Sequence, residues 1–198
     1  QLNPHFLCNT LDTMKWISKI NRIPQVAEMS ANLADILRFC ISPEEFVYLR
    51  REMEILERYV EIQEIRMSGA FDFRVELPEE LADCLIPKMI LQPLVENAIL
   101  HGVEGAADGA VEVTVRQEAE MLRITVRDNG AGLPEELAAG WYESLSPAGK
   151  HLGLYNVSTI LTKYYGEGCG LFLENGPDGA GAVVTAVLPA RREEKEPC

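Results

Sequence analysis

The spacing of apolar residues changes near Met67, and this change constrains the fold more than any other feature of the sequence. Before it, apolar positions recur every three or four residues, which is the period of a helix. After it, Phe71, Phe73 and Val75 alternate with charged residues, as in a strand with one face exposed to solvent. The sequence therefore predicts an α+β chain, with a helical unit over residues 1–68 and a unit of helices and strands over residues 69–190.

Helices are expected throughout the first unit. Asn3 can cap a helix that begins at Pro4 and runs to about Asn21, which places His5 in the first turn. Two later helices, the first ending near Ser42, carry apolar seams. The seams are Val26, Met29, Leu33, Ile36 and Cys40, then Leu49, Met53, Leu56, Val60, Gln63 and Met67. Such seams need a partner, which is either a second copy of the chain in a helical dimer or the chain's own second unit.

The second unit is expected to pack helices on a sheet. Ile86 to Gly102 is interpreted as one buried helix, with Pro87 at its start and a distortion at Pro93. The other expected elements are strands over 111–117, 122–127, 171–174 and 182–188 and a helix over 154–165. Residues 134–150 are rich in Gly, Pro, Ser and Glu, which predicts a mobile connection, and the charged residues 191–198 predict a disordered tail.

The charge balance argues against nucleic acid as a direct partner. The chain has 18 basic and 31 acidic residues, a net charge of −13, whereas a phosphate-binding face needs clustered positive charge. The acidic stretch Glu44 to Glu64 is interpreted as a solvated helix face without a function of its own.

Cysteine spacing and hydropathy limit the location of the chain. The five cysteines are widely separated and form no C-x-x-C pair, so neither a zinc site nor a disulfide framework is indicated, and a reducing cytoplasm fits. No apolar run approaches the roughly 18 to 20 residues of a membrane span. Any membrane attachment is therefore expected to lie in segments upstream of Gln1.

Asn97 and His101 form the first candidate nucleotide-binding group. They are four residues apart, so they share one face of the predicted helix. The amide oxygen of Asn97 is a hard ligand suited to Mg²⁺, and His101 can meet a phosphate oxygen. The alternative is a buried asparagine that bonds only a neighbouring backbone group.

Two glycine-containing segments complete the candidate site. Asp128 precedes Gly130 and Gly132, where an ionised carboxylate can accept hydrogen bonds from the amine of adenine and the glycines permit close approach. A plain loop or a calcium contact would give the same pattern. Gly153 and Leu154 open the predicted helix over 154–165, whose free N–H groups favour a phosphate.

In this order and spacing, the three segments resemble the ATP-binding domain that histidine kinases share with gyrase-type topoisomerases, Hsp90 and MutL. The front of the chain, Gln1 to Asp12, resembles the phosphoacceptor box of the LytS/YesM-like sensor histidine kinases. The likeness continues through Leu37–Phe39, Glu57–Gln63, Arg66, Ile86–Lys88 and Gln92–Ala98. It implies the GHKL (Bergerat) fold for the second unit, a two-layer sandwich of a mixed sheet with helices on one face.

The resemblance also implies a function and assigns roles. The function is that of a two-component sensor kinase, in which ATP phosphorylates His5 and the phosphate passes to an aspartate of a response regulator, usually one with an AraC-type DNA-binding domain. ATP would be bound by Asn97, His101, Asp128, Gly130, Gly132, Gly153 and Leu154, with Mg²⁺ on Asn97 and a lid over residues 140–153. A homodimer is implied, in the cytoplasmic portion of a bacterial cell-membrane protein.

Several positions depart from the family pattern. Phe6 follows His5 where many relatives have an acid, so the general base is unassigned, and Leu100, His151 and Ala182 replace a lysine, a glycine and a threonine. A weakly active kinase or an ATP-binding scaffold is therefore one alternative. A GHKL ATPase is the other, although Pro93 occupies the position of the base that such enzymes use, which leaves Glu96 as the acid to test.

Overall fold

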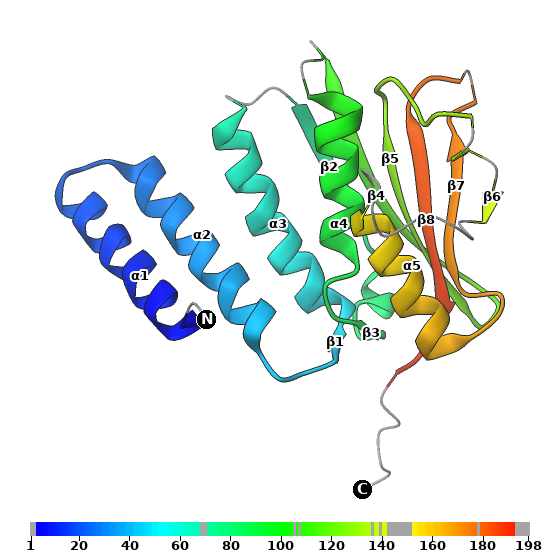
Figure 1. Cartoon of the computed structure of the whole chain (residues 1–198), viewed down its shortest axis with the longest axis horizontal. Helices are drawn as coiled ribbons and strands as arrows, with labels where there is room; N and C mark the ends of the chain where they lie inside the picture. The colour runs from blue at the N-terminus through cyan, green and yellow to red at the C-terminus, as the bar shows by residue number, and fades with distance from the viewer. Residues whose placement is uncertain are drawn as a thin grey trace, which may run out of the picture.

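The chain has the predicted α+β architecture (Figure 1). In this computed structural model, three helices stand side by side and lead to a mixed sheet with further helices packed on it. The structure describes residues 3–67, 71–104, 106, 108–135, 137–138, 140–141, 152–177 and 179–192. No helix in these ranges is long and apolar enough to cross a membrane.

The first three helices are α1 (Pro4–Ile20), α2 (Pro24–Ile41) and α3 (Leu49–Arg66), which confirms the predicted helical unit. The expected cap is present, because Asn3 Oδ1 accepts a hydrogen bond of 3.0 Å from the backbone N–H of His5. His5 therefore lies in the first turn of α1. Each helix packs on the next in chain order.

The two predicted seams have different partners. The seam of α3 is buried in its own chain, where Leu49 and Leu56 join the hydrophobic core that continues under the sheet. The seam of α2 is largely exposed, since 43% of Val26 and 47% of Leu33 are accessible. Packing on the second unit is thus the correct interpretation for α3, whereas in the described chain only Ile36 of the α2 seam joins that core.

The sheet has strand order β2-β4-β5-β8-β7-β6 in the part of the chain that the structure describes. Its strands are β2 (Phe71–Glu76), β4 (Gly109–Glu118), β5 (Met121–Asp128), β6 (Gly140–Trp141), β7 (Gly170–Asn175) and β8 (Ala182–Pro189). Strand β2 runs parallel to β4, and the other neighbours are antiparallel. Helices α4 (Leu91–Asn97) and α5 (Leu152–Tyr165) cover one face (Figure 1). Because helices cover one face of the sheet, side chains along β4 alternate between buried and exposed, with Val113 buried and Glu112 exposed.

The predicted helix from Ile86 to Gly102 is wrong at its start. Leu85–Pro87 is a short strand, β3, which pairs antiparallel with β1 (Phe46–Tyr48), so that Ile86 lies opposite Val47. Pro87 is tolerated because this sheet has two strands in the described chain and its missing N–H falls at an edge. Helix α4 begins only at Leu91 and continues beyond Asn97 as a π-helix, η2 (Ala98–Val103).

Smaller differences lie near the chain's end and in the predicted connection. Gly140 pairs with Leu173, so β6 lies inside the stretch expected to be a loop, while residues 142–151, and with them most of the predicted lid, fall outside the described residues. The backbone N–H of Leu85 donates to the carbonyl of Arg191 at 2.7 Å, so ordered pairing includes the first residue of the predicted tail. A short 3-10 helix, η1 (Glu79–Leu81), precedes β3.

Candidate functional site

Asn97 occupies the last position of α4 and lines a pocket of about 220 Å³. The pocket is also lined by His101 of η2 and by Gly153 and Leu154 at the start of α5. The structure thus brings together four of the predicted nucleotide-binding residues. Asn97 is 8% exposed, whereas His101 is exposed to solvent.

The helix changes geometry immediately after Asn97. Its hydrogen bonding widens to the π pattern, in which the N–H of Glu104 donates to the carbonyl of Ile99 at 2.9 Å. Isolated π turns within helices are common at functional sites. Here the wide turn carries His101 and ends beside Gly102, where the backbone meets Asp128.

Gly153 allows the start of α5 to approach α4 closely. A Cβ at Gly153 would lie 3.1 Å from the Cβ of Pro93. The next residue, Leu154, is buried in the core, which fixes the first turn of α5 against the sheet. The N-terminal end of α5 therefore faces the pocket that Asn97 lines, as required of a helix that binds phosphate through its free N–H groups.

Asp128 is buried at the end of β5, with 3% of its surface exposed. Its Oδ1 accepts hydrogen bonds from the N–H groups of Gly130, at 2.9 Å, and Ala182, at 3.2 Å. Burial raises the pKa of this carboxyl group above its ordinary value, and the two N–H donors act in the opposite direction. Within the described residues no donor contacts Oδ2, so this oxygen can accept a hydrogen bond from a ligand amine.

Three glycines allow separate backbone segments to meet around Asp128. A Cβ at Gly102 would lie 2.5 Å from Asp128 Cγ, and one at Gly130 would lie 1.8 Å from the carbonyl oxygen of Gly102. A Cβ at Gly181 would lie 2.0 Å from the carbonyl oxygen of Asp128. Only glycine fits such distances. Gly132, with φ of +78°, turns the chain after Asp128.

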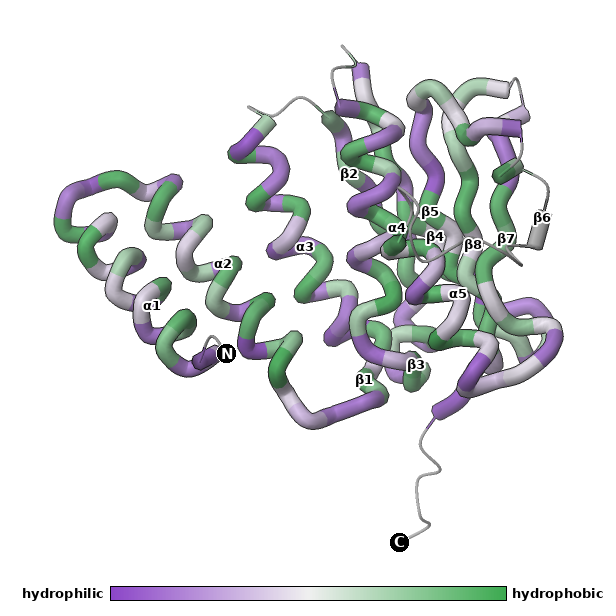
Figure 2. The backbone as a smooth tube through the Cα atoms, viewed as in Figure 1, coloured by the Kyte–Doolittle hydropathy of each residue, from purple (hydrophilic) through white to green (hydrophobic). Residues whose placement is uncertain are grey.

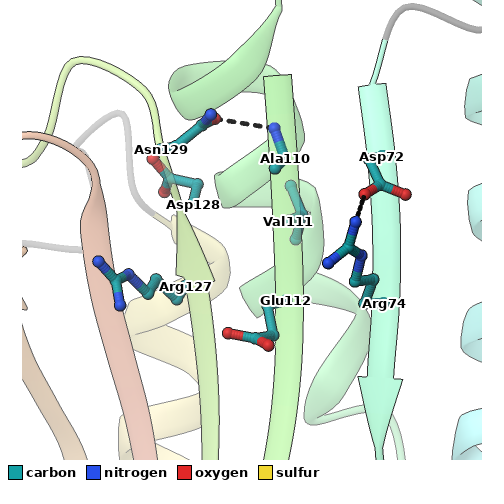
Figure 3. Close-up of a pocket in the computed structure, with 8 residues that line it drawn as sticks. All are labelled: Asp72, Arg74, Ala110, Val111, Glu112, Arg127, Asp128 and Asn129. Atoms are coloured by element: carbon teal, nitrogen blue, oxygen red, sulfur yellow. Dashed lines mark hydrogen bonds and ion pairs between the residues drawn. The ribbon is translucent and has the colours of Figure 1, made fainter. Parts of the chain in front are cut away.

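Two asparagines hold the turns beside Asp128. Asn129 Oδ1 accepts a hydrogen bond of 2.8 Å from the N–H of Ala110 (Figure 3). Its Nδ2 donates one of 2.8 Å to the carbonyl of Asp108. Asn175 clamps Leu133 in the same way, accepting from its N–H at 2.6 Å and donating to its carbonyl at 3.0 Å. Sequence reasoning missed both residues, because their partners lie far away in the chain.

The residues present fit a magnesium ion held mainly by its nucleotide. The described residues contain no cluster of three or more His, Cys, Asp and Glu side chains that could hold a metal by itself. Asn97 offers one amide oxygen in a pocket that Glu96 also lines. Mg²⁺ commonly takes few protein ligands, together with phosphate oxygens and water. Asn97 is therefore a suitable protein ligand for Mg²⁺ bound to ATP.

His5 lies exposed on α1, away from this pocket. Its Nδ1 is 3.3 Å from Nδ2 of Asn9, one turn along the helix. Asp12, the first acid after His5 in the sequence, is bonded to Arg38 of α2 at 2.6 Å. Helices α2 and α3 stand between α1 and α4 (Figure 1), so the structure does not bring His5 to Asn97 within this chain.

The fold and the site define an ATP-binding domain of the GHKL type. A mixed sheet with helices on one face carries the buried Asn97, the glycine-bounded Asp128 and the helix that opens at Gly153. Residues 83–192 match the family model described as "Histidine kinase-, DNA gyrase B-, and HSP90-like ATPase". Residues 1–71 match the model described as "Histidine kinase". The chain belongs to the histidine kinase family.

The curated relatives that the chain matches include sensor histidine kinases. The chain is 32% identical over 195 residues to sensor histidine kinase YesM of Bacillus subtilis (strain 168). It is also 32% identical over 195 residues to sensor histidine kinase BtsS of Escherichia coli (strain K12). Both alignments cover 98% of this chain and 33% of the relative. The chain therefore spans about a third of the length of the curated relatives it matches.

Solved histidine kinase structures share the fold. The catalytic domain of histidine kinase ThkA has a TM-score of 0.57 at 23% identity, covering 75% of this chain and 97% of that chain. ThkA in complex with the response regulator protein TrrA has a TM-score of 0.51 at 19% identity, covering 98% of this chain and 59% of that chain. At these identities the likeness concerns the fold alone.

Proposed function

We propose that this chain is the catalytic portion of a sensor histidine kinase that transfers the γ-phosphoryl group of ATP to His5. The observation that carries the proposal is the gathering of Asn97, His101, Gly153 and Leu154 in one pocket, next to the glycine-bounded Asp128. An acceptor histidine exposed on a capped helix accompanies this pocket in the same chain. Family membership supports the same assignment.

In the proposed ATP complex, Asp128 and Asn97 hold opposite ends of the nucleotide. Oδ2 of Asp128, which has no donor among the described residues, accepts a hydrogen bond from the exocyclic amine of adenine. Asn97 and the first turn of α5 face the phosphates, and His101 donates to a phosphate oxygen. Mg²⁺, when bound at Asn97, neutralises charge on the phosphates. Gly130 and Gly132 keep the turn beside adenine free of side chains.

His5 then acts as a nucleophile. A neutral ring nitrogen attacks the γ-phosphorus, a nitrogen–phosphorus bond forms, and the bond from that phosphorus to the bridging oxygen breaks as ADP leaves. The imidazole proton passes to solvent or to a base, and the phosphoryl group afterwards moves to an aspartate of a receiver domain. Asp12 is paired with Arg38, and the side chain of Asn9 contacts the ring.

A homodimer formed through α1 and α2 is the second part of the proposal. Figure 2 shows hydrophobic segments along these two helices as well as in the strands. Phe6 is 62% exposed, Trp16 60%, Ile20 79% and Leu33 47%. Large apolar side chains gathered on one exposed hairpin are typical of an interface rather than of a monomer surface. A second copy would also supply an ATP site that is not separated from His5 by the chain's own α2 and α3.

The remaining partners and the domain limits follow the family. We propose a receiver domain as the phosphate acceptor, carried by a regulator with an AraC-type DNA-binding domain, and a place on the cytoplasmic side of a bacterial cell membrane. The complex of ThkA with TrrA supports the first of these. We also propose a functional division at residue 68, supported by family models that end at residue 71 and begin at residue 83.

Incubation with γ-labelled ATP and Mg²⁺ tests the proposal. The wild type is expected to become labelled, whereas His5→Ala and Asn97→Ala lose the label. Thr13→Ala, an exposed change on the same helix, serves as the matched control and retains it. Label that survives His5→Ala would rule out His5 as the acceptor.

The same assay separates the two alternatives. Nucleotide binding without any label favours an ATP-binding scaffold. Steady release of phosphate without label favours an ATPase, and loss of that release in Glu96→Gln would identify its base.

A further inference from the structure

Glu52 is a buried acid that forms hydrogen bonds with the backbone at the start of α4. It lies on α3, it is 3% exposed, and its two oxygens accept hydrogen bonds from two backbone N–H groups. The N–H of Met89 donates to Oε2 at 2.9 Å and that of Leu91 to Oε1 at 3.0 Å. These donors belong to the turn that opens α4, so a side chain from another helix caps α4 across 39 residues of sequence.

The turn that Glu52 holds has an uncommon backbone conformation. Met89 has φ of +66°, in the left-handed region that residues other than glycine seldom adopt. This conformation turns the chain from β3 into α4 and directs the Met89 and Leu91 N–H groups to one carboxyl group. A strained residue persists where its surroundings fix it, and here Glu52 supplies that restraint.

The opposite side of the same turn is bonded to α2. Lys88 Nζ donates to the carbonyl oxygen of Ser42 at 2.5 Å and contacts that of Cys40 at 3.4 Å, at the C-terminal end of α2. The segment from Lys88 to Leu91 therefore connects α2 on one side and α3 on the other. Helix α2 leads directly to α1, which carries His5.

Helix α4 transmits this placement to the nucleotide pocket. Asn97 follows Leu91 by six residues, about 9 Å at the rise of an α-helix. The N-cap residue of α4, Ile90, provides no side-chain hydrogen bond, and the first turn contains no acid. Within the described chain, the side-chain hydrogen bonds that hold the start of α4 thus come from Glu52.

We propose that Glu52 is a positioning residue for the Mg²⁺–ATP site: by holding the turn at Met89, it sets the position of α4 and hence of Asn97 relative to α2 and α3. This inference rests on the proposed function in one respect, the role of Asn97 toward the phosphates. Asp128 sits on β5, where the N–H groups of Gly130 and Ala182 hold its carboxyl group, so we expect the adenine end of the site to respond less than the phosphate end.

Two ligands separate this positioning role from a general loss of structure. For Glu52→Gln, whose amide directs a donor at a backbone N–H, we expect the dissociation constant of Mg²⁺–ATP to rise about tenfold or more. The dissociation constant of adenosine without Mg²⁺ should stay within about twofold of the wild type. Glu54→Gln is the control, because Glu54 is exposed on the same helix and its ion pair in the described chain is with exposed Arg51. It should leave both constants unchanged.

A rescue variant keeps the test decisive if Glu52→Gln folds poorly. Met89→Gly retains the N–H donor and removes the strain of a positive φ, so Glu52→Gln/Met89→Gly should recover most of the lost Mg²⁺–ATP affinity. Equal losses for Mg²⁺–ATP and adenosine, no loss in Glu52→Gln, or a double variant that recovers nothing would each overturn the inference. Failure of the proposed function is distinct, because it appears as unchanged Mg²⁺–ATP affinity in Asn97→Ala.

Discussion

A side chain at Gly102 would collide with Asp128. An ideal Cβ at Gly102 lies 2.5 Å from Asp128 Cγ and 2.7 Å from Oδ1, the oxygen that accepts the hydrogen bonds of Gly130 and Ala182. We therefore expect Gly102→Ala to displace the carboxyl group, to cost about 1–3 kcal/mol of unfolding free energy, and to weaken adenosine binding by about tenfold.

Isothermal titration with adenosine and urea unfolding check this prediction. Glu104→Ala is the matched control, since Glu104 is exposed near the end of the same helix and contacts Arg66 at 3.5 Å. It should keep the affinity of the wild type. An unchanged affinity in Gly102→Ala would show that the carboxyl group of Asp128 can move without loss of the nucleotide.

A leucine-to-alanine substitution is expected to have different effects in the seams of α2 and α3. Leu56 is 1% exposed within the core, so Leu56→Ala should lower the unfolding free energy by about 2–5 kcal/mol. Leu33 is 47% exposed, so Leu33→Ala should cost less than about 1 kcal/mol in the monomer and should weaken the proposed dimer. Urea unfolding at low protein concentration measures the stability of the monomer, and sedimentation at increasing protein concentration measures dimerisation. A dimer unaffected by Leu33→Ala would place the interface elsewhere.

Long periodic elements could be predicted from the sequence, and short paired ones could not. Helix α3 has five heptad-spaced seam residues and strand β4 alternates over most of its length, so each carries its own signal. Strands β1 and β3 have three residues each and exist only because they pair across 40 residues of chain. The apolar run that begins at Ile86 therefore favoured a helix from the sequence alone. The turn at Met89, which separates β3 from α4, does not change the pattern of apolar residues in the sequence.

The site shows the same division between local and distant signals. The spacing of Asn97 and His101 predicts a shared helix face, whereas the grouping of Gly153 with them followed from the family resemblance, and the structure places all three in one pocket. Glu52 lies in an acidic run interpreted as a solvated face. That is correct for exposed Glu54 and Glu57 and wrong for Glu52, whose partners are the distant N–H groups of Met89 and Leu91. Only the folded backbone brings such partners together.

The raised pKa of Asp128 predicts the pH dependence of adenine binding. Its ionised form accepts the amine hydrogen bond, and burial raises the pKa above the ordinary value. Adenosine affinity should therefore fall on acidification at a higher pH than an ordinary aspartate would give. Adenosine is the suitable ligand, because phosphate groups titrate near pH 6. Asp128→Asn should bind weakly without this pH step, and a step at the ordinary aspartate pKa would contradict the prediction.

Burial of the Glu52 carboxyl group predicts that its contribution to the free energy of unfolding decreases as the pH rises. Burial is the largest influence and raises its pKa, while the N–H groups of Met89 and Leu91 and the charge of Lys88 lower it. The folded chain then binds the proton more tightly than the unfolded chain does. The stability contribution is full below the unfolded pKa and is lost as the pH rises toward the folded pKa.

The measurable quantity is the difference in unfolding free energy between wild type and Glu52→Gln, followed by urea unfolding across the acidic range. It should decrease with rising pH above the ordinary glutamate pKa, with a slope of at most about 1.4 kcal/mol per pH unit for one proton. Glu54→Gln should show no such slope, because Glu54 is exposed. A difference that instead grows with pH would mean that the N–H groups of Met89 and Leu91 outweigh burial. Glu52 would then stabilise the start of α4 most strongly as an anion.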